Sequence, residues 1–464
     1  MSTISSILNT SVSGLMAYQV AIDVTSNNIA NANTEGYSRQ SVVIREDYVS
    51  NSSGGWIFSG CDAVAVARSC DQFSRNQVLD SSQDVGRYET ASQYMSSIEA
   101  IFNELEGVGL SNALTEFWNS WQDLAETDSP PGTTERSVLV GNAQTLADIF
   151  NTMYSDLNDI QTEIDRDIAL NIDEINDLIN GIAELNAQLV RAEASGQNTN
   201  SLLDSLDSAM TELSYLVDIN YFQDETGQFF VQLKDGRSLV DGSTSYELGT
   251  ELNVTTGHLD ITWIDGSGTA TVITNVIEGG ALGGALSTRD DLIQGYQNDL
   301  DDLALTLMTE INNLLTAGFD VEGQPGTALF TGTGAGDIAV DANIIDDPGL
   351  IAASATATGV PGDLDVAVAV AELQDALLMN GGMTTLDEFY DSLVSQVGAQ
   401  ADSLEDESEY HSDLLSFFQE LKESVTGVST NEETANLILY QNAYDACARV
   451  VTVVQEIMDT VLNM

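Results

Sequence analysis

Both ends of the chain carry a heptad repeat of apolar and small residues. Near the N-terminus these positions alternate in steps of four and three, at Ile4, Leu8, Ser11, Leu15, Tyr18, Ile22, Thr25 and Ile29. The C-terminal end repeats the pattern at Leu437, Tyr440, Tyr444, Cys447, Val451, Val454, Met458 and Val461. Because this spacing places one apolar seam along a helix, we expect terminal helices that pair as a coiled coil.

Charged side chains are scarce in both terminal segments, although the chain as a whole is very acidic. The 464 residues include 73 acidic and 13 basic side chains, for a formal net charge of −60. Residues 1–34 carry charge at Asp23, and residues 434–464 carry it at Asp445, Arg449, Glu456 and Asp459. Such helices could close an ordinary intramolecular bundle, but the low charge outside the seam favours contacts with neighbouring subunits.

The end of the first predicted helix is rich in asparagine instead of acid. The stretch SNNIANANTEGYSRQ contains Asn27, Asn28, Asn31 and Asn33, followed by Gly36 and Tyr37. Asparagine and glycine supply turn chemistry, so the helix should end here. In an assembly, asparagine amides can form directional hydrogen bonds to neighbours, whereas packed carboxylates would repel one another and resist desolvation.

The excess of acid limits the partners of the chain. A net charge of −60 repels nucleic acid phosphates and anionic lipid head groups, so we expect no nucleic acid partner and no membrane partner. Two interpretations of the charge compete: a solvated surface adapted to a high-salt medium, or carboxylates gathered to bind cations. The acids are spread along the chain and not packed at ligand spacing, which favours the first interpretation.

Length and composition indicate a folded protein of several domains, because 464 residues exceed the usual size of one domain. The three cysteines, Cys61, Cys70 and Cys447, are too few and too scattered for a disulfide framework. The N-terminal sequence lacks the basic region of a secretory signal, and no run of about 18 apolar residues appears. We therefore expect a chain without a cleaved signal and without a membrane span.

The order of patterns predicts a mainly α fold with a β-rich inserted domain. Residues 40–48 look extended, residues 50–56 form a loop, and helical patterns follow, including a long run that should build a rod of roughly 75 Å. Alternation and tight turns at Asp235-Gly236 and Asp265-Gly266 indicate strands. The expected units are a terminal coiled-coil assembly domain at 1–40 and 430–464, a helical rod domain at 41–218 and 285–429 with a Gly-rich and acidic loop near 318–360, and an outer β-rich domain at 219–284.

The sequence contains no convincing motif for catalysis or for cofactor binding. His258 and His411 have no further His or Cys ligands at short spacing, so we expect surface or packing roles for both. The glycines at 332–336 lack the spacing and the lysine of a phosphate loop and predict a plain turn. Phe117, Trp118 and Trp121 fall on one helix face and should anchor the core. We expect no enzyme activity, no cofactor, no metal site and no small-molecule substrate.

Several stretches resemble one known protein family. The segment SSILNTSVSGLMAYQVAIDVTSNNIANANTEGYSRQ is similar to the N-terminal signature of the bacterial flagellar axial proteins, and NEETANLILYQNAYDACARVVTVVQEIMDTVLNM is similar to their C-terminal helix. Internal segments such as LTEFWNSWQDLAE, ALFTGTG and LDEFYDSLVSQVG resemble the hook-associated protein 1 family, the first hook-filament junction proteins. The resemblance touches most of the chain.

The resemblance implies a structural role in the flagellum. Members of this family are exported from the cytoplasm without a cleaved signal and stack outside the cell, with their terminal helices as the inner wall of a tube. Expected partners are the hook protein, the second junction protein, copies of the same chain in a ring, and an export chaperone at the C-terminal helix. Two alternatives stay open: another axial component such as the second junction protein, and an acidic secreted protein that binds cations.

Overall fold

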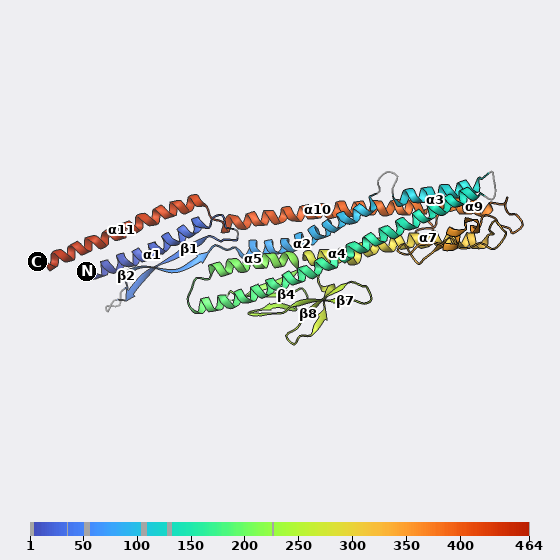
Figure 1. Cartoon of the computed structure of the whole chain (residues 1–464). Coiled ribbons are helices and arrows are strands. Elements are labelled where there is room, and N and C mark those ends of the chain that lie inside the picture. Colours follow the sequence, from blue (N-terminus) through green and yellow to red (C-terminus); the bar gives the residue numbers. More distant parts are fainter. Residues whose placement is uncertain are drawn as a thin grey trace.

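The chain folds into an elongated molecule with both termini at the same end (Figure 1). The computed structural model describes residues 4–34, 36–50, 56–103, 109–127, 132–224 and 227–463. Long helices run along the axis of the molecule, and a small group of strands lies beside the C-terminal half of the long helix α4 (Thr133–Ala194; Figure 1). The molecule therefore consists of a terminal unit, a helical rod and a lateral β region.

Helices make up most of the described chain. They are α1 (Ile4–Ala30), α2 (Gln72–Phe102), α3 (Leu110–Ala125), α4 (Thr133–Ala194), α5 (Asn200–Leu216), α6 (Gly280–Ser287), a π-helical segment (Thr288–Ile293), α7 (Gln294–Ala317), α8 (Ala342–Asp346), α9 (Asp365–Ala371), α10 (Leu386–Thr426) and α11 (Thr430–Leu462). The start of α10 shows why these boundaries fall where they do. The Thr385 side chain accepts a hydrogen bond from the Glu388 amide while the Glu388 carboxylate accepts one from the Thr385 amide.

The strands of the described residues form four antiparallel sheets. A long hairpin pairs β1 (Gln40–Ser50) with β2 (Trp56–Arg68). The β region contains one sheet in the order β3-β4-β5-β6 and a second in the order β7-β8-β9. Its strands are β3 (Ile219–Gln223), β4 (Phe229–Leu233), β5 (Ser238–Asp241), β6 (Thr244–Ser245), β7 (Leu248–Leu252), β8 (Leu259–Ile264) and β9 (Ala270–Val272), and the short pair β10 (Phe330–Thr331) and β11 (Ala339–Val340) lies apart from them.

The rod is built around α4, a single helix of 62 residues. At about 1.5 Å per residue such a helix is roughly 90 Å long. One face is apolar along its whole length, with Leu146, Phe150, Leu157, Ile164, Ile168, Ile175, Ile179, Ile182 and Leu189 all fully buried. Helices α2, α3, α5 and α7 contact α4, and α10 packs along α2. The periodic isoleucines thus form the core of an elongated bundle.

Asparagine side chains on the rod helix α4 form paired hydrogen bonds with the backbone of the β region, as the backbone of a neighbouring strand would. Asn186 of α4 donates to the carbonyl of Phe229 (2.8 Å) and accepts from its amide (3.0 Å), and Asn176 forms the same pair of bonds with Leu248. Asp165 of α4 adds an ion pair with the buried Arg289 and lies 3.0 Å from Nδ1 of His258. These contacts fix the β region on the side of α4.

The predicted fold class is confirmed, because the structure is mainly helical with paired terminal helices and a separate β region. Phe117, Trp118 and Trp121 are fully buried, as expected of core anchors. The long helix is longer than predicted, since it begins at Thr133. Strand β2 was missed, although Ala63–Ala67 alternates alanine and valine, and most of the predicted loop at 50–56 lies outside the described residues.

Two glycines in helix interiors should respond to alanine in opposite ways. A Cβ on Gly86 of α2 would collide with the Tyr215 carbonyl and approach the backbone of Ala281, whereas a Cβ on Gly181 of α4 has open space. We predict that Gly86→Ala destabilises the chain by about 1 to 3 kcal/mol through overpacking. Gly181→Ala should stabilise it by up to about 1 kcal/mol through helix propensity. Urea unfolding followed by circular dichroism checks both, and equal effects would contradict the packing of α2 against α5 and α6.

Candidate assembly interface

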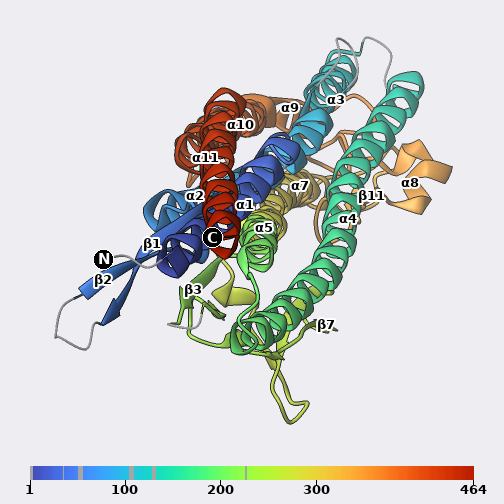
Figure 2. The ribbon, with the colours of Figure 1, turned by 90° about the vertical axis from the view of Figure 1, so that its left-hand side faces the viewer.

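The terminal unit consists of α1, the β1–β2 hairpin and α11. Helix α1 lies between the other two parts, with α11 along one side and the hairpin along another (Figure 2). Asn28 of α1 contacts Glu433, and Gly14 faces Cys447, so α1 and α11 are antiparallel. The structure therefore brings together the two ends of the chain that the heptad repeats single out.

Small residues form the centre of the contact made by α1. Its buried positions are Ser11, Gly14, Ala17, Ala21, Thr25 and Asn28. A Cβ on Gly14 would lie 3.1 Å from the sulfur of Cys447, which shows how closely the two helices approach. The larger residues of the predicted seam are half-buried around this centre, at Ile4, Leu8, Leu15, Tyr18, Ile22 and Ile29.

The predicted seam of α11 faces α1 over most of its length. Leu437, Tyr440, Tyr444, Cys447 and Val451 are half-buried and Val454 is buried, whereas Met458 and Val461 are exposed. The rings of Tyr18 and Tyr440 lie 6.4 Å apart across the contact. Val454 therefore belongs to the contact within one chain.

A second apolar stripe on α11 is uncovered. Leu439, Val450, Val453 and Ile457 are all at least 41% exposed, and they lie at helical spacing on a side of α11 next to the seam that faces α1. The charged residues of α11 beyond its first turn occupy a third side, at Asp445, Arg449, Glu456 and Asp459. On α1, Ile7 and Met16 are exposed as well. In the monomer, apolar and uncharged surface on both helices is therefore exposed to solvent.

The β1–β2 hairpin completes the terminal unit and was not anticipated there. A Cβ on Gly60, which has a φ of 129°, would collide with the Ser13 hydroxyl of α1, so the hairpin backbone lies directly on the helix. The Ser13 hydroxyl also accepts a hydrogen bond from the Cys61 amide. On its outer surface the hairpin exposes Val43, Ile44, Tyr48 and Val64. This hairpin adds apolar surface next to the helix pair.

Asn28 is the polar centre of the terminal unit. It is fully buried, donates from Nδ2 to the Gln40 carbonyl (2.8 Å) and to Oε2 of Glu433 (2.9 Å), and accepts at Oδ1 from the Gln40 amide (3.0 Å). The Tyr37 hydroxyl donates to the same Oδ1 at 2.8 Å. One neutral side chain therefore joins the end of α1, the start of β1 and the start of α11.

Arg39 and Glu433 complete this polar centre. The Glu433 side chain is 3% exposed and pairs with the Arg39 guanidinium at 2.8 Å. Burial raises the pKa of Tyr37, and the nearby carboxylates of Asp204 and Glu433 raise it further, so its hydroxyl stays a proton donor. Neither Arg39 nor Glu433 was among the predicted interface residues, because their partners are distant in sequence.

The other predicted turn residues lie at the surface of the terminal unit. Asn31 donates to the side-chain oxygen of Asn27 at 2.8 Å within the last turns of α1. Asn33 is exposed, and Gly36 has a φ of 74° with open space around it. Of the four asparagines, Asn28 is buried, Asn31 is half-buried, and Asn27 and Asn33 are exposed.

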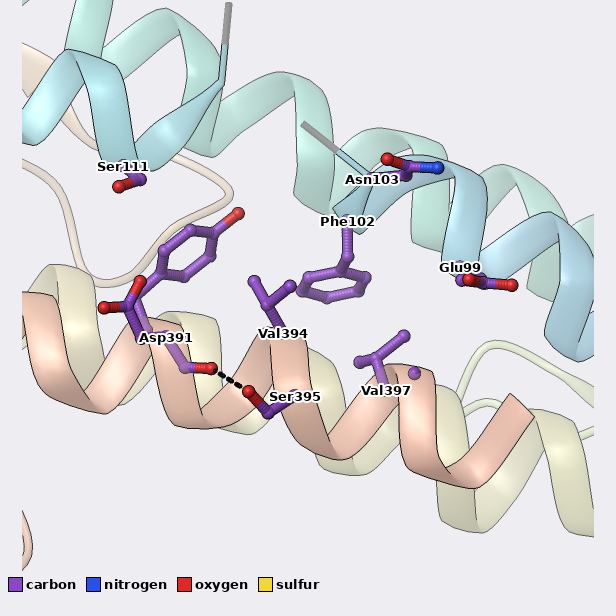
Figure 3. A pocket seen from close by; sticks show the side chains of 10 residues that line it. Glu99, Phe102, Asn103, Ser111, Asp391, Val394, Ser395 and Val397 are labelled. Carbon is purple, nitrogen blue, oxygen red and sulfur yellow. Dashed lines mark hydrogen bonds between the residues drawn. The ribbon is translucent and has the colours of Figure 1, made fainter. Parts of the chain in front are cut away.

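The structure offers little to a small molecule or a metal. The cavity in Figure 3, of 480 Å³, lies between α2, α3 and α10, and its apolar part is formed by Phe102, Val394 and Val397. Its described lining has carboxylates at Glu99 and Asp391 but no histidine, cysteine or basic group. Across the described residues, no three His, Cys, Asp or Glu side chains cluster as metal ligands. Likewise, no helix in the described ranges is long and apolar enough to cross a membrane.

Family models match the chain in three segments. The model of the flagellar hook-associated protein FlgK helical domain matches residues 95–330. The flagella basal body rod protein model matches residues 8–37, and the model of the flagellar basal body rod FlgEFG protein C-terminal segment matches residues 424–464. The last two segments contain most of α1 and all of α11. The family resemblance inferred from the sequence is confirmed.

Individual relatives match nearly the whole chain. Flagellar hook-associated protein 1 of Bacillus subtilis is 28% identical over 496 residues, covering 98% of this chain and 97% of that protein. The protein of the same name from Escherichia coli is 26% identical over 552 residues, covering 99% of this chain and 100% of that protein. The solved structure of the flagellar hook junction protein FlgK from Burkholderia pseudomallei shares the fold, with a TM-score of 0.65 at 17% identity over 76% of this chain and 100% of that one.

The environment of Asn28 predicts a large difference between two neighbouring asparagines. Asn28→Asp removes two donated hydrogen bonds and places a second carboxylate against the buried Glu433, which should destabilise the helix pair by at least about 2 kcal/mol. The matched change Asn27→Asp adds the same charge at an exposed position. Hydrogen exchange of the α11 amides measures both variants. Equal protection of α11 in the two would contradict the assigned role of Asn28.

Proposed function

Because the chain belongs to the family of the flagellar hook-associated protein FlgK, we propose that it is a structural subunit of the junction between the flagellar hook and filament. The observation that carries the proposal is the terminal unit, in which the nearly uncharged α1 pairs with the seam of α11 and a further apolar stripe without charge stays open on α11. Rod-protein family models match both helices, which supports a mode of assembly shared with other flagellar axial proteins.

Assembly proceeds through the open surfaces of the terminal unit. A second copy that covers Leu439, Val450, Val453 and Ile457 removes apolar surface from water, at about 25 cal/mol for each Å². The stripe contains no charge to desolvate, so this gain is not offset by the large penalty of burying ions. The predicted interface residues Asn27, Asn33 and Met458 are exposed on the same unit and are available for polar and apolar contacts between subunits, and Asn31 is half-buried beside them.

The finer assignments follow from membership of the family. We propose that copies of the chain form a ring that contacts the hook protein on one side and the second junction protein on the other. We propose an extracellular location in the flagellum after export without a cleaved signal, with an export chaperone at α11 before export. The protein acts as a structural subunit and not as an enzyme. The hairpin at 40–68 lies on α1, so we propose to count it with the terminal domain, leaving 219–284 as the outer β domain.

The acidic surface is proposed to suit a saline medium. At a net charge of −60, repulsion between carboxylates weakens as the Debye length falls from about 14 Å at 0.05 M to about 2 Å at 2 M salt. We predict that the monomer is less helical and has a larger radius of gyration at the lower salt concentration. Circular dichroism and small-angle X-ray scattering at the two concentrations check this. Identical curves would remove the proposed link between surface charge and salt.

Cells that lack the protein provide the test of function. They should carry hooks without filaments and release filament subunits into the medium, and the wild-type chain should restore the filaments. Val453→Asp should fail to restore them, because assembly would bury an unpaired charge. Gln441→Asp places the same charge on the charged side of α11, where it stays exposed, and should restore them. Normal filaments on cells without the protein would refute the junction role, and rescue by Val453→Asp would refute the α11 stripe as interface.

A further inference from the structure

We propose that a polar latch at the base of the terminal unit fixes the direction in which its helices point relative to the rod. The latch consists of two clusters: Asn28, Arg39 and Glu433 in the first, and Arg68, Arg75, Asp204 and Asp207 in the second. The contacts that form the latch are observed whatever the protein does, and only the effect of the latch on assembly rests on the proposed function.

The need for a latch follows from how the two parts of the molecule meet. Within the described ranges, α1, β1, β2 and α11 pack on one another, and none of them packs along a helix of the rod. The chain crosses between the two parts at 68–72, where β2 leads into α2, and at 426–430, where α10 leads into α11. Without further contacts the terminal unit could turn about these short connections.

The second cluster ties the base of the hairpin to α5 of the rod. Arg68, the last residue of β2, pairs through Nη1 with Asp204 (2.9 Å) and Asp207 (2.7 Å), and Arg75 of α2 reaches Asp207 at 3.3 Å. The side chains of all four residues are 11% exposed or less. Burial alone would lower the pKa of Arg68, but Asp207 and Asp204 raise it, so the guanidinium stays charged. Asn200 of α5 adds a hydrogen bond to the Val66 carbonyl at 3.0 Å.

The first cluster continues into the second through residues 37–40. The Ser38 amide donates a hydrogen bond to the Asp204 carboxylate at 3.3 Å. The backbone of Arg39 forms two more: its amide donates to the carbonyl of Thr426 at the end of α10 (2.8 Å), and its carbonyl accepts from the Ser69 amide (2.8 Å). The carboxylates of Asp204 and Glu433, one from each cluster, lie near enough to Tyr37 that both raise the pKa of its hydroxyl. A continuous set of polar contacts therefore joins α1, α11, β2, α5 and the end of α10.

The placement of basic residues supports this role. The chain has 13 lysines and arginines among its 464 residues, and Arg39, Arg68 and Arg75 all lie at this joint. An arginine that bridges two buried carboxylates holds them in a defined geometry, and removing one partner of such a group leaves uncompensated charge. A joint of this kind resists small rotations, whereas an apolar contact of the same size would allow sliding.

A rigid joint has a consequence for assembly. Each subunit must present the open stripe of α11 in the direction that the neighbouring subunits require. If loss of the latch leaves the terminal unit in that direction for about a tenth of the time, the concentration needed for assembly rises roughly tenfold. The latch would therefore act by preparing the subunit before contact and not by touching its neighbours.

Distance measurements on the free monomer test the latch directly. Spin labels are placed at Thr452→Cys of α11 and Ser201→Cys of α5, both exposed, in a chain whose three cysteines are changed to serine. In Arg68→Gln we expect the distribution of label distances, measured by double electron-electron resonance, to broaden at least about twofold, since the guanidinium that joins β2 to α5 is lost. Helical content should stay unchanged.

Two further variants make the result decisive. Arg191→Gln makes the same substitution at an exposed arginine of α4 and should leave the distribution unchanged. Arg68→Met combined with Asp204→Asn removes the guanidinium and the carboxylate of one ion pair together, so Asp204 is not left as an unpaired buried charge. This double variant should fold even if Arg68→Gln does not, and its label distances should be broader than those of the wild type. A narrow, wild-type distribution in the folded double variant would overturn the latch. This result does not depend on assembly, so a failure of the junction role in cells would be recognised separately.

Discussion

Repulsion among carboxylates decides where this chain can form contacts. With 73 acidic and 13 basic side chains, two acidic surfaces that approach each other repel, and each buried carboxylate adds a desolvation cost. The extended contact between the chain ends pairs α1, whose one charged side chain is Asp23, with the seam of α11, and the charges of α11 beyond its first turn lie on another side. The uncovered stripe on α11 also contains no charge. The terminal unit is therefore the part of the molecule best suited to packing against further copies.

Where polar contacts are needed, the chain uses neutral amides or its few arginines. Asn28, Asn176, Asn186 and Asn312 each donate to the carbonyl and accept from the amide of one residue on another segment, as an adjacent strand would. An aspartate at these positions could accept but not donate, and it would bring a charge into the interior. Asn28, near the end of α1, follows the same rule as the asparagines that dock the β region on the rod.

Periodicity made the helices and the pairing of the chain ends predictable, because each heptad seam is local and can be read from one segment. The face of α11 that contacts α1 agrees with its seam from Leu437 to Val454. The polar centre could not be predicted in this way: Asn28 and Glu433 are 405 positions apart, and no local pattern pairs them. The position of the hairpin on α1 was not predicted, because it depends on the close contact of the Gly60 backbone with the Ser13 side chain. Composition and periodicity do not reveal a contact of this kind.

A reconstruction by electron cryomicroscopy of the junction between hook and filament tests the central claim most directly. It shows which surfaces of the subunit meet a neighbour when the ring is complete. If the terminal unit assembles through its uncharged surface, Val453 and Ile457 of α11 will lie in van der Waals contact with an adjacent copy, while Asp445 and Glu456 face solvent or a polar channel. A ring held together by the rod or the β region, with the α11 stripe in contact with water, would contradict the claim.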